Sequence, residues 1–325
     1  MKPINVCPGT LADGYDSYSP ICLKHLFDGK KTSPFLEFDH NADENYVSSV
    51  NRISVSGVQE KISAIARKGE IIITPEGCHG SHIIKPAPDF RHLNFRQQIP
   101  ANEHLTMQIA RQVYGIATAE NAMVFFKDGE DAYITKRFDY GKNGNKIQQE
   151  DFCSLMQKPV IDKYSGSYED IAKALKHYVS AWQIELSKYF ALVVFNYLFA
   201  NGDAHLKNFS LMKTIDGDYV LTPAYDLLNT SIHVNESDFA LKDGLMPKSE
   251  YSETYRNTGH PCSEDFIRFG HRIGVMESKI LQTIKLFSTS QPMVSELTNR
   301  SFLDEKTKRM YLRSYQERLS RFNRT

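Results

Sequence analysis

The sequence predicts an α+β fold with two lobes, a β-rich small lobe followed by a mainly helical large lobe. Short segments of strand character gather between residues 51 and 139, and a helical period takes over in residues 140–325. Residues 1–50 carry Pro, Gly, Ser and Asp throughout and show no sustained period, so we expect an irregular lead-in there. With 325 residues, of which 41% are hydrophobic, the chain can fill the cores of both lobes.

Five strands and one helix are expected in the small lobe. The strands are, in chain order, residues 61–66, 71–74, 81–85, 122–126 and 132–138. The first two form a hairpin, Pro86 and Pro88 stop the third, and the Asp128-Gly129 step is a strong hairpin signal between the last two. Between the third and fourth strands, apolar residues at helical spacing predict a helix capped by Asn102 and ending at Gly115.

The large lobe begins with a predicted central helix. Residues 180–200 are apolar around most of the circumference of a helix, so this helix should be buried. A hairpin of residues 209–212 and 219–221 follows it, and helices are expected from residue 263 onward. The last segment, residues 306–324, has seven basic residues against one acidic residue and apolar residues at helical spacing. We interpret it as a solvent-exposed amphipathic helix rather than a docking surface for an acidic partner.

An aspartate stands five residues before an asparagine directly after the central helix. Asp203 and Asn208 have the spacing of a protein-kinase catalytic loop, which needs a carboxylate for the proton of the attacking hydroxyl and a neutral oxygen ligand for Mg²⁺. Taken alone, a five-residue spacing is more typical of a polar turn that closes the helix. Three companions follow the kinase order: a loop containing Gly57 before the first strand, Lys85 at the end of the third strand, and Asp226 after the late hairpin. Together they favour a kinase.

These segments resemble the HipA family of bacterial serine/threonine kinases, the toxin components of toxin–antitoxin systems. The similarity lies within about residues 50–230, in segments 53–61, 82–85, 102–103, 136–139, 149–151, 202–210 and 221–226. Two-lobed, protein-kinase-like folding of the HipA type is therefore expected. The resemblance also implies ATP and Mg²⁺ as cofactors.

Roles for individual residues follow from the resemblance. It implies that Asp203 is the catalytic base, with His205 and Lys207 in the same loop, and that Asn208 and Asp226 bind Mg²⁺. Residues 136–138 would be the hinge where main chain meets adenine, and Glu103 would form an ion pair with Lys85. The implied ATP contacts are Ser56, Gly57, Val58, Gln59, Lys61, Lys85, Lys136 and Phe138.

The chain departs from the family pattern at its N-terminus. Members of full length carry a subdomain of about a hundred residues before the phosphate loop, where this chain has about fifty irregular residues. It looks like the shorter HipT branch, in which a separate small protein, HipS, supplies that subdomain beside a HipB-type DNA-binding antitoxin. A further departure is the segment Asp226-Leu227-Leu228, which lacks the glycine of the kinase D-F-G motif. Activation-loop switching of the usual kind is not expected.

Two serines of the phosphate loop suggest regulation. A phosphate on Ser54 or Ser56 would add a charge of about −1.5 to −2 where ATP places its own phosphates, so repulsion should expel the loop or the nucleotide. We therefore predict inhibitory autophosphorylation at Ser54 or Ser56. The alternative is that both hydroxyls only form hydrogen bonds within the loop or to bound phosphate.

The substrate and the partners follow only from the resemblance. It suggests that the substrate is a protein, an aminoacyl-tRNA synthetase. Two other functions stay open: a catalytically weak nucleotide-binding module that acts by complex formation, and a metal-dependent phosphohydrolase built from Asp203, His205 and Asp226. The second is disfavoured because the histidines show no ligand-like spacing.

Composition bears on where the protein acts. Lys plus Arg and Asp plus Glu both number 39, so no overall charge favours nucleic acid or a membrane surface as the partner. The five cysteines are widely spread, without a metal-binding pair, and the N-terminus has no apolar signal region. We expect a cytoplasmic protein that contacts neither membrane nor DNA directly.

Overall fold

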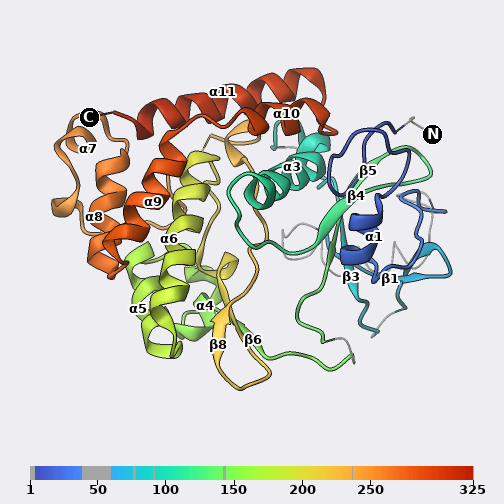
Figure 1. The fold of residues 1–325 in the computed structure, drawn as a ribbon, viewed down its shortest axis with the longest axis horizontal. Helices are drawn as coiled ribbons and strands as arrows, with labels where there is room; N and C mark the ends of the chain where they lie inside the picture. Colours follow the sequence, from blue (N-terminus) through green and yellow to red (C-terminus); the bar gives the residue numbers. More distant parts are fainter. Residues whose placement is uncertain are drawn as a thin grey trace.

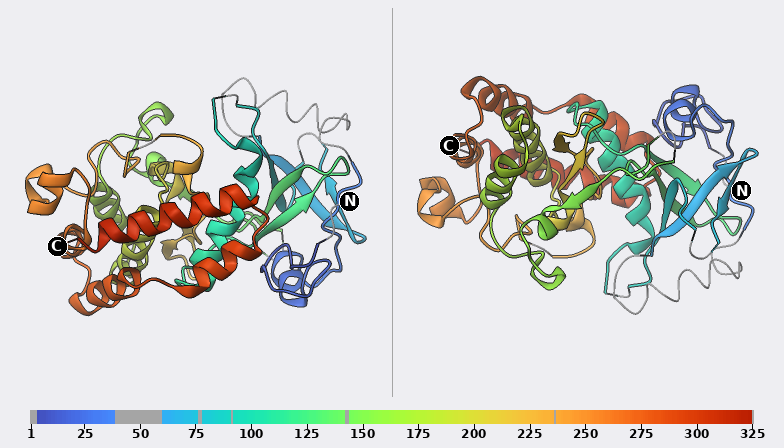
Figure 2. Two further views of the ribbon diagram at one scale, coloured as in Figure 1. Left: turned by 90° about the horizontal axis from the view of Figure 1, so that it is seen from above. Right: turned by 90° about the horizontal axis from the view of Figure 1, so that it is seen from below.

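Two lobes stand side by side in the computed structural model, which describes residues 4–38, 60–75, 78–90, 92–141, 144–235 and 237–324. Figure 1 shows the strands of the first lobe at the right and the helices of the second at the left. Seen from above and below in Figure 2, the helix α11 (Glu305–Phe322) runs lengthwise along the large lobe toward the sheet. Its position ties the two lobes together.

The small lobe is built on a five-stranded antiparallel sheet of order β2-β1-β3-β5-β4. Its strands are β1 (Ile62–Arg67), β2 (Glu70–Ile73), β3 (His82–Pro86), β4 (Asn121–Phe125) and β5 (Asp131–Lys136). Lys68 and Gly69 both have positive φ, as the tight hairpin turn between β1 and β2 requires. Gly80 admits no side chain, because a Cβ there would lie 2.2 Å from the carbonyl oxygen of Ala64. The five strands occur where the sequence predicts them.

The helix α3 (Ile99–Gln112) packs on β4 and β5 of this sheet. Its N-cap is Gln98, four residues before the predicted cap, because Pro100 stands in the first turn of the helix and fixes φ there. Asn102 is therefore not a cap. Its buried side chain instead donates a 2.9 Å hydrogen bond to the carbonyl of Asn229 and lies 2.8 Å from Nε2 of His233. Asn102 thus links α3 to the large lobe.

Residues 4–38 are less irregular than the sequence indicates. They contain the helix α1 (Pro20–Leu26), whose N-terminus Ser19 caps by accepting the N–H of Cys22. Leu26 and Phe27 are buried in one cluster with Ile62 and Ile84 of the sheet. A helix of seven residues is too short to show a period in the sequence. This segment therefore completes the core of the small lobe.

The large lobe surrounds the helix α6 (Trp182–Leu198), which is buried as predicted. A small antiparallel sheet of order β6-β7-β8 lies at its edge, formed by β6 (Gln149–Asp151), β7 (Ser210–Lys213) and β8 (Tyr219–Leu221). The other α-helices are α4 (Phe152–Leu155), α5 (Tyr168–Tyr178), α7 (Glu253–Thr258), α8 (Ser263–Ile273), α9 (Glu277–Ser288) and α10 (Pro292–Arg300). In the described part of the chain, no helix has the length and apolar character needed to cross a membrane.

The C-terminal helix α11 is amphipathic, as its sequence predicts. Its apolar face is buried, and the hydroxyl of Tyr311 lies 2.9 Å from that of Thr106 on α3. One turn further along, the hydroxyls of Tyr315 and Tyr114 lie 3.2 Å apart. These contacts fix α3, and with it Glu103, relative to the large lobe.

Candidate active site

Lys85, Glu103 and Asp226 form one ionic cluster between the lobes. Lys85 lies on β3, and its Nζ is 2.6 Å from Oε1 of Glu103 on α3 and also bonds Oδ1 of Asp226. The side chains of Lys85 and Glu103 are each 5% exposed, whereas that of Asp226 is 32% exposed. Glu103 is therefore the buried partner that holds the lysine, and Asp226 is the carboxylate that faces the cleft.

Charge and burial oppose each other in this cluster. Burial acts to lower the pKa of Lys85, but the carboxylates of Asp226 and Glu103 outweigh it and raise the pKa, so the ammonium is charged. For Asp226, burial acts to raise the pKa, and the Lys85 ammonium reverses this and lowers it. For Glu103, burial raises the pKa and Lys85 offsets only part of the shift. Asp226 is thus the firmly ionised carboxylate that a cation would meet.

Asp226 also has an unusual backbone. Its φ is +55°, in the left-handed region that non-glycine residues rarely adopt. Its carbonyl accepts a hydrogen bond from the side chain of Asn201, 3.4 Å away, at the start of the catalytic loop. Strain of this kind persists where surrounding contacts hold it, and it is concentrated at functional sites. The conformation aims the carboxylate at both Lys85 and the catalytic loop.

Asn208 is brought to Asp226 by the predicted loop. A short 3₁₀ helix, Leu206–Asn208, ends the loop, and the side-chain oxygen of Asn208 accepts the N–H of His205 at 3.2 Å. The Nδ2 atom of Asn208 is 3.5 Å from Oδ2 of Asp226. Mg²⁺ prefers carboxylate and amide oxygens, and this pair of side chains supplies one of each. The amide nitrogen of Asn208 faces Asp226 here and its oxygen is bonded to His205, so metal binding would require the Asn208 amide to turn. In the described ranges, no group of three or more His, Cys, Asp and Glu side chains is arranged to hold a metal ion.

The predicted base, Asp203, is held by a residue that no motif indicated. Its Oδ1 accepts a 2.7 Å hydrogen bond from the hydroxyl of Tyr164. The ring of Tyr164 also lies edge to face with the ring of His205, with centroids 5.0 Å apart. Burial lowers the pKa of His205 although the Asp203 carboxylate acts to raise it, so the imidazole is neutral near pH 7. Tyr164 therefore orients both predicted catalytic side chains.

A cavity of about 310 Å³ between the lobes is lined by all of the predicted ATP contacts that lie within the described residues. Lys61, Lys85, Lys136, Phe138 and Asp226 line it, together with Lys207 of the catalytic loop. Asp203, His205 and Asn208 do not line it. Five predicted residues of the phosphate loop lie outside the described residues: Ser54, Ser56, Gly57, Val58 and Gln59.

Residues 136–138 are predicted to bind adenine through main-chain atoms, and the structure indicates which of their N–H groups is available. The N–H groups of Lys136 and Arg137 are already bonded to the carbonyls of Glu120 and Ser81. The Lys136 side chain turns away from the cavity, with Nζ 2.6 Å from Oδ1 of Asp28. Within the described residues, the N–H of Phe138 has no hydrogen-bond partner, so it is the candidate donor to adenine.

The side chains of Asp151 and Tyr225 also line the cavity, although the sequence predicted no role for them. Asp151 Oδ2 lies 2.6 Å from Nζ of Lys207, and the Tyr225 hydroxyl donates to the carbonyl of Lys207 at 2.8 Å. Both residues lie in segments that resemble the HipA family, so that resemblance was the available signal. Tyr164 lies in no such segment, and no sequence pattern identified it.

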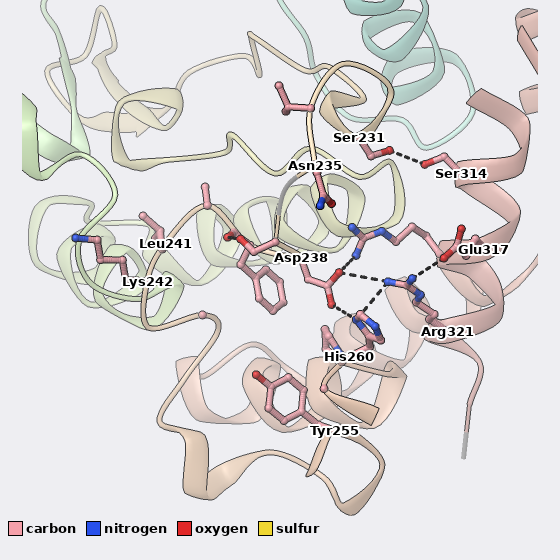
Figure 3. Close-up of a pocket in the computed structure, with 18 of the residues that line it drawn as sticks. Ser231, Asn235, Asp238, Leu241, Lys242, Tyr255, His260, Ser314, Glu317 and Arg321 are labelled. Carbon is pink, nitrogen blue, oxygen red and sulfur yellow. Dashed lines mark hydrogen bonds and ion pairs between the residues drawn. The ribbon is translucent and has the colours of Figure 1, made fainter. Parts of the chain in front are cut away.

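A larger cavity of about 870 Å³ lies on the large lobe (Figure 3). One wall includes Lys242, whose N–H bonds the carbonyl of Tyr164 at 3.0 Å. Another part of the lining begins at Ser231, next to Thr230, whose hydroxyl accepts the N–H of Gly202 at 2.8 Å. This part is therefore bonded to the loop that carries Asp203, whereas Lys242 is bonded to Tyr164, the residue that holds the Asp203 carboxylate.

Figure 3 also shows a network of charged side chains in the lining of this cavity. The Asp238 carboxylate is 2.7 Å from Nδ1 of His260 and bonds the guanidinium of Arg318, with Arg321 3.5 Å away. Arg318 and Arg321 belong to α11, so this network fastens the C-terminal helix to the segment after Asp226. It gives the cavity a fixed wall.

Comparison with known proteins agrees with this geometry. Residues 53–294 match the family model described as the HipA-like C-terminal domain. The chain belongs to the HipA-like family. A candidate kinase of Haemophilus influenzae is 27% identical, and the match covers 96% of this chain and 94% of that protein. The serine/threonine-protein kinase toxin HipA of Shewanella oneidensis is 27% identical over 62% of this chain, and the chain spans only 49% of that protein.

A solved structure confirms the fold. HipA in the Shewanella oneidensis complex of HipA, HipB and operator DNA superposes with a TM-score of 0.64 at 22% sequence identity. The match covers 82% of this chain and 64% of that chain. The predicted α+β, two-lobed, HipA-type fold is therefore correct.

Proposed function

We propose that this protein is an ATP-dependent serine/threonine protein kinase and the toxin of a toxin–antitoxin system of the HipT branch. The observation that carries the proposal is the cluster of Lys85, Glu103 and Asp226, with the side chain of Asn208 next to Asp226. A buried lysine ion pair, a second aspartate and an asparagine at this spacing are the parts that phosphoryl transfer from ATP needs. The family and the kinase names of its relatives support it.

The residues present suggest how the transfer proceeds. Lys85, held by Glu103, would bind the ATP phosphates, and the Phe138 N–H would bind adenine. Mg²⁺ held by Asn208 and Asp226 would neutralise the charge that develops on the phosphates. Tyr164 occupies Oδ1 of Asp203, so we expect Oδ2 to accept the proton of the attacking hydroxyl. Lys207, fixed by Asp151, adds positive charge at the same cavity.

The protein substrate would approach along the 870 Å³ cavity, because its lining is bonded to the catalytic loop beside Thr230 and to Tyr164, which holds Asp203, beside Lys242. An aminoacyl-tRNA synthetase is the substrate that we propose, by analogy with the family, and its phosphorylation would stop translation. The solved relative was crystallised with HipB and operator DNA. We propose HipB-like and HipS-like partners for this cytoplasmic protein, with DNA contacts made by the HipB-like partner.

Phosphoproteomics tests the proposed activity directly. Cells expressing the wild-type protein should show one hyperphosphorylated protein at serine or threonine, and cells expressing the Asp203→Ala variant should not. Identical phosphoproteomes for the two proteins would contradict the proposal, provided that both accumulate to the same level.

Autophosphorylation is proposed at Ser54 or Ser56. After incubation with Mg²⁺ and ATP, the intact mass of the wild-type protein should increase by one or more phosphates, and that of Asp203→Ala should not. The Ser54→Ala/Ser56→Ala variant should also remain unmodified. Equal masses for the wild type and Asp203→Ala would contradict self-modification without bearing on the activity toward other proteins.

Tyr164→Phe should lower kcat by about tenfold while leaving the KM for ATP unchanged. The hydroxyl bonds the Asp203 carboxylate and does not line the nucleotide cavity, so only the orientation of Asp203 should change. Steady-state kinetics with varied ATP separate kcat from KM. An unchanged kcat would show that Tyr164 does not position Asp203.

A further inference from the structure

An apolar groove opens on the large lobe, next to the wall of the ATP cavity. It has a volume of about 660 Å³. Its two long walls are helix faces, one from Gln183 to Leu192 on α6 and one from Met276 to Thr283 along α9. The connection between α3 and β4, residues 114–117, closes the groove toward the small lobe. In Figure 1, α6 and α9 lie next to each other.

Large apolar side chains of this groove are left in solvent. Ile184 is 62% exposed and Met276 is 55% exposed. Along α9, residues 276, 279, 283 and 286 follow helical spacing, so Leu286, 36% exposed, continues the same face. Exposed apolar residues that line a cavity indicate a binding site more than scattered ones do. Methionine adds a side chain that adapts to a partner's shape.

The length of the groove suits a helix. From Gln183 to Leu192 the α6 wall spans about 14 Å, at about 1.5 Å per residue. A bound amphipathic helix anchors itself through apolar side chains at i, i+3 or i+4, and i+7, which cover about 10 Å. One such set of anchors fits between the two walls.

The charges at the groove have one sign. Lys188 and Lys279 line it, and no carboxylate does so among the described residues. Lys188 is already shared with the buried Glu185, whose Oε1 is 2.7 Å from its Nζ. Lys279 lies 3.4 Å from the side-chain oxygen of Gln282, a neutral group. A partner carboxylate would therefore gain most beside Lys279.

We propose that this groove binds an amphipathic helix of a partner protein, with its apolar stripe between α6 and α9 and an Asp or Glu of its edge at Lys279. The partner would act on the active site through a shared wall. Ser210 lines both the groove and the ATP cavity, and Asn208 lines the groove while its side chain reaches Asp226. This site is separate from the proposed phosphoryl transfer and does not depend on it.

Fluorescence anisotropy with two labelled, helix-stabilised peptides tests the proposal on the full chain. Both peptides carry leucines at i, i+3 and i+7, and the flanking residues are glutamates in one and lysines in the other. The wild-type protein should bind the glutamate peptide about tenfold more tightly than the lysine peptide. Ile184→Glu/Met276→Glu should weaken binding by about tenfold or more, because the apolar contacts are lost.

Two further variants make the test specific. Lys279→Glu should reverse the preference, so that the lysine peptide binds more tightly. Ile161→Glu/Ile215→Glu is the matched control, since these side chains are 88% and 101% exposed, do not line the groove and should leave binding unchanged. No binding to the wild type, equal affinity for both peptides, or an unaffected Ile184→Glu/Met276→Glu protein would each overturn the proposal.

Discussion

Replacing Asp203 with asparagine should lower the rate of phosphoryl transfer by about 10²–10⁴-fold. Asparagine is nearly the same size and can still form a hydrogen bond with Tyr164, but it cannot accept the proton of the attacking hydroxyl. ATP affinity should change little, because Asp203 does not line the cavity that holds the predicted ATP contacts. Single-turnover transfer from [γ-³²P]ATP measures the rate, and isothermal titration with a non-hydrolysable analogue measures the affinity.

The matched control for this experiment is Asp216→Asn. Asp216 lies in the exposed turn between β7 and β8, so its replacement should leave both rate and affinity unchanged. If Asp203→Asn transfers phosphate within a few-fold of the wild-type rate, Asp203 is not the base. If it loses ATP affinity instead of rate, its role is in binding.

Replacing Lys85 with methionine should lower the free energy of unfolding by about 3 kcal/mol and abolish detectable ATP binding. The change leaves the carboxylates of Glu103 and Asp226 beside each other without a cation, and removal of one partner from a buried pair is more costly than the pair itself is worth. Urea unfolding followed by circular dichroism measures the loss. Because Asp226 is partly exposed, the lower end of the usual range of about 3–5 kcal/mol applies.

A second variant and the pH dependence of stability distinguish the loss of the ion pairs from a non-specific destabilisation of the fold. Lys85→Met/Glu103→Gln removes one of the two unpaired charges, so it should be more stable than Lys85→Met alone. In Lys85→Met, the pKa values of both carboxylates should rise above their unfolded values, so the stability of this variant should increase as the pH falls from 7 toward 5. Equal stability of Lys85→Met and the wild type would mean that the cluster does not hold the lobes together.

In acid, the stability of the wild-type protein should change with pH in the opposite direction. The folded pKa of Asp226 is lowered, so its contribution to stability is present above its unfolded value of about 3.9 and is lost as the pH falls through the folded value. The pKa of Lys85 is raised, so its contribution is present below about 10.4 and is lost at still higher pH. The raised pKa of Glu103 acts against the contribution of Asp226 in acid, because ionising this buried group costs stability as the pH rises.

The strands and the central helix could be predicted from the sequence because each carries its own periodic signal. The strands β1 to β5 and the buried helix α6 are clear examples. The start of α3 could not, because Asn102 has the chemistry of a cap and its real partners, Asn229 and His233, are more than a hundred residues away. The role of residues 4–38 in the core could not be predicted either, because their packing partners in the sheet are distant in the sequence.

The site also contains residues that a sequence motif predicts and residues that only the fold brings into place. That Lys85, Asn208 and Asp226 lie close together could be predicted, because phosphoryl transfer requires those residue types in a fixed order. The roles of these residues and of Asp203 stay predictions. Tyr164 could not, since a hydroxyl that orients a carboxylate can come from any segment that folds beside it, and here it comes from a stretch without a motif. The apolar groove could not be predicted from the sequence either, because its walls are brought together only by the packing of α6 against α9.

The most direct test of the central claim is a crystal structure of the protein with Mg²⁺ and a non-hydrolysable ATP analogue. We expect adenine at the main chain of Phe138, phosphates at Lys85, and the metal on Asn208 and Asp226, with Asp203 facing the terminal phosphate. Nucleotide bound outside the interlobe cavity, or a metal held by neither Asn208 nor Asp226, would contradict it.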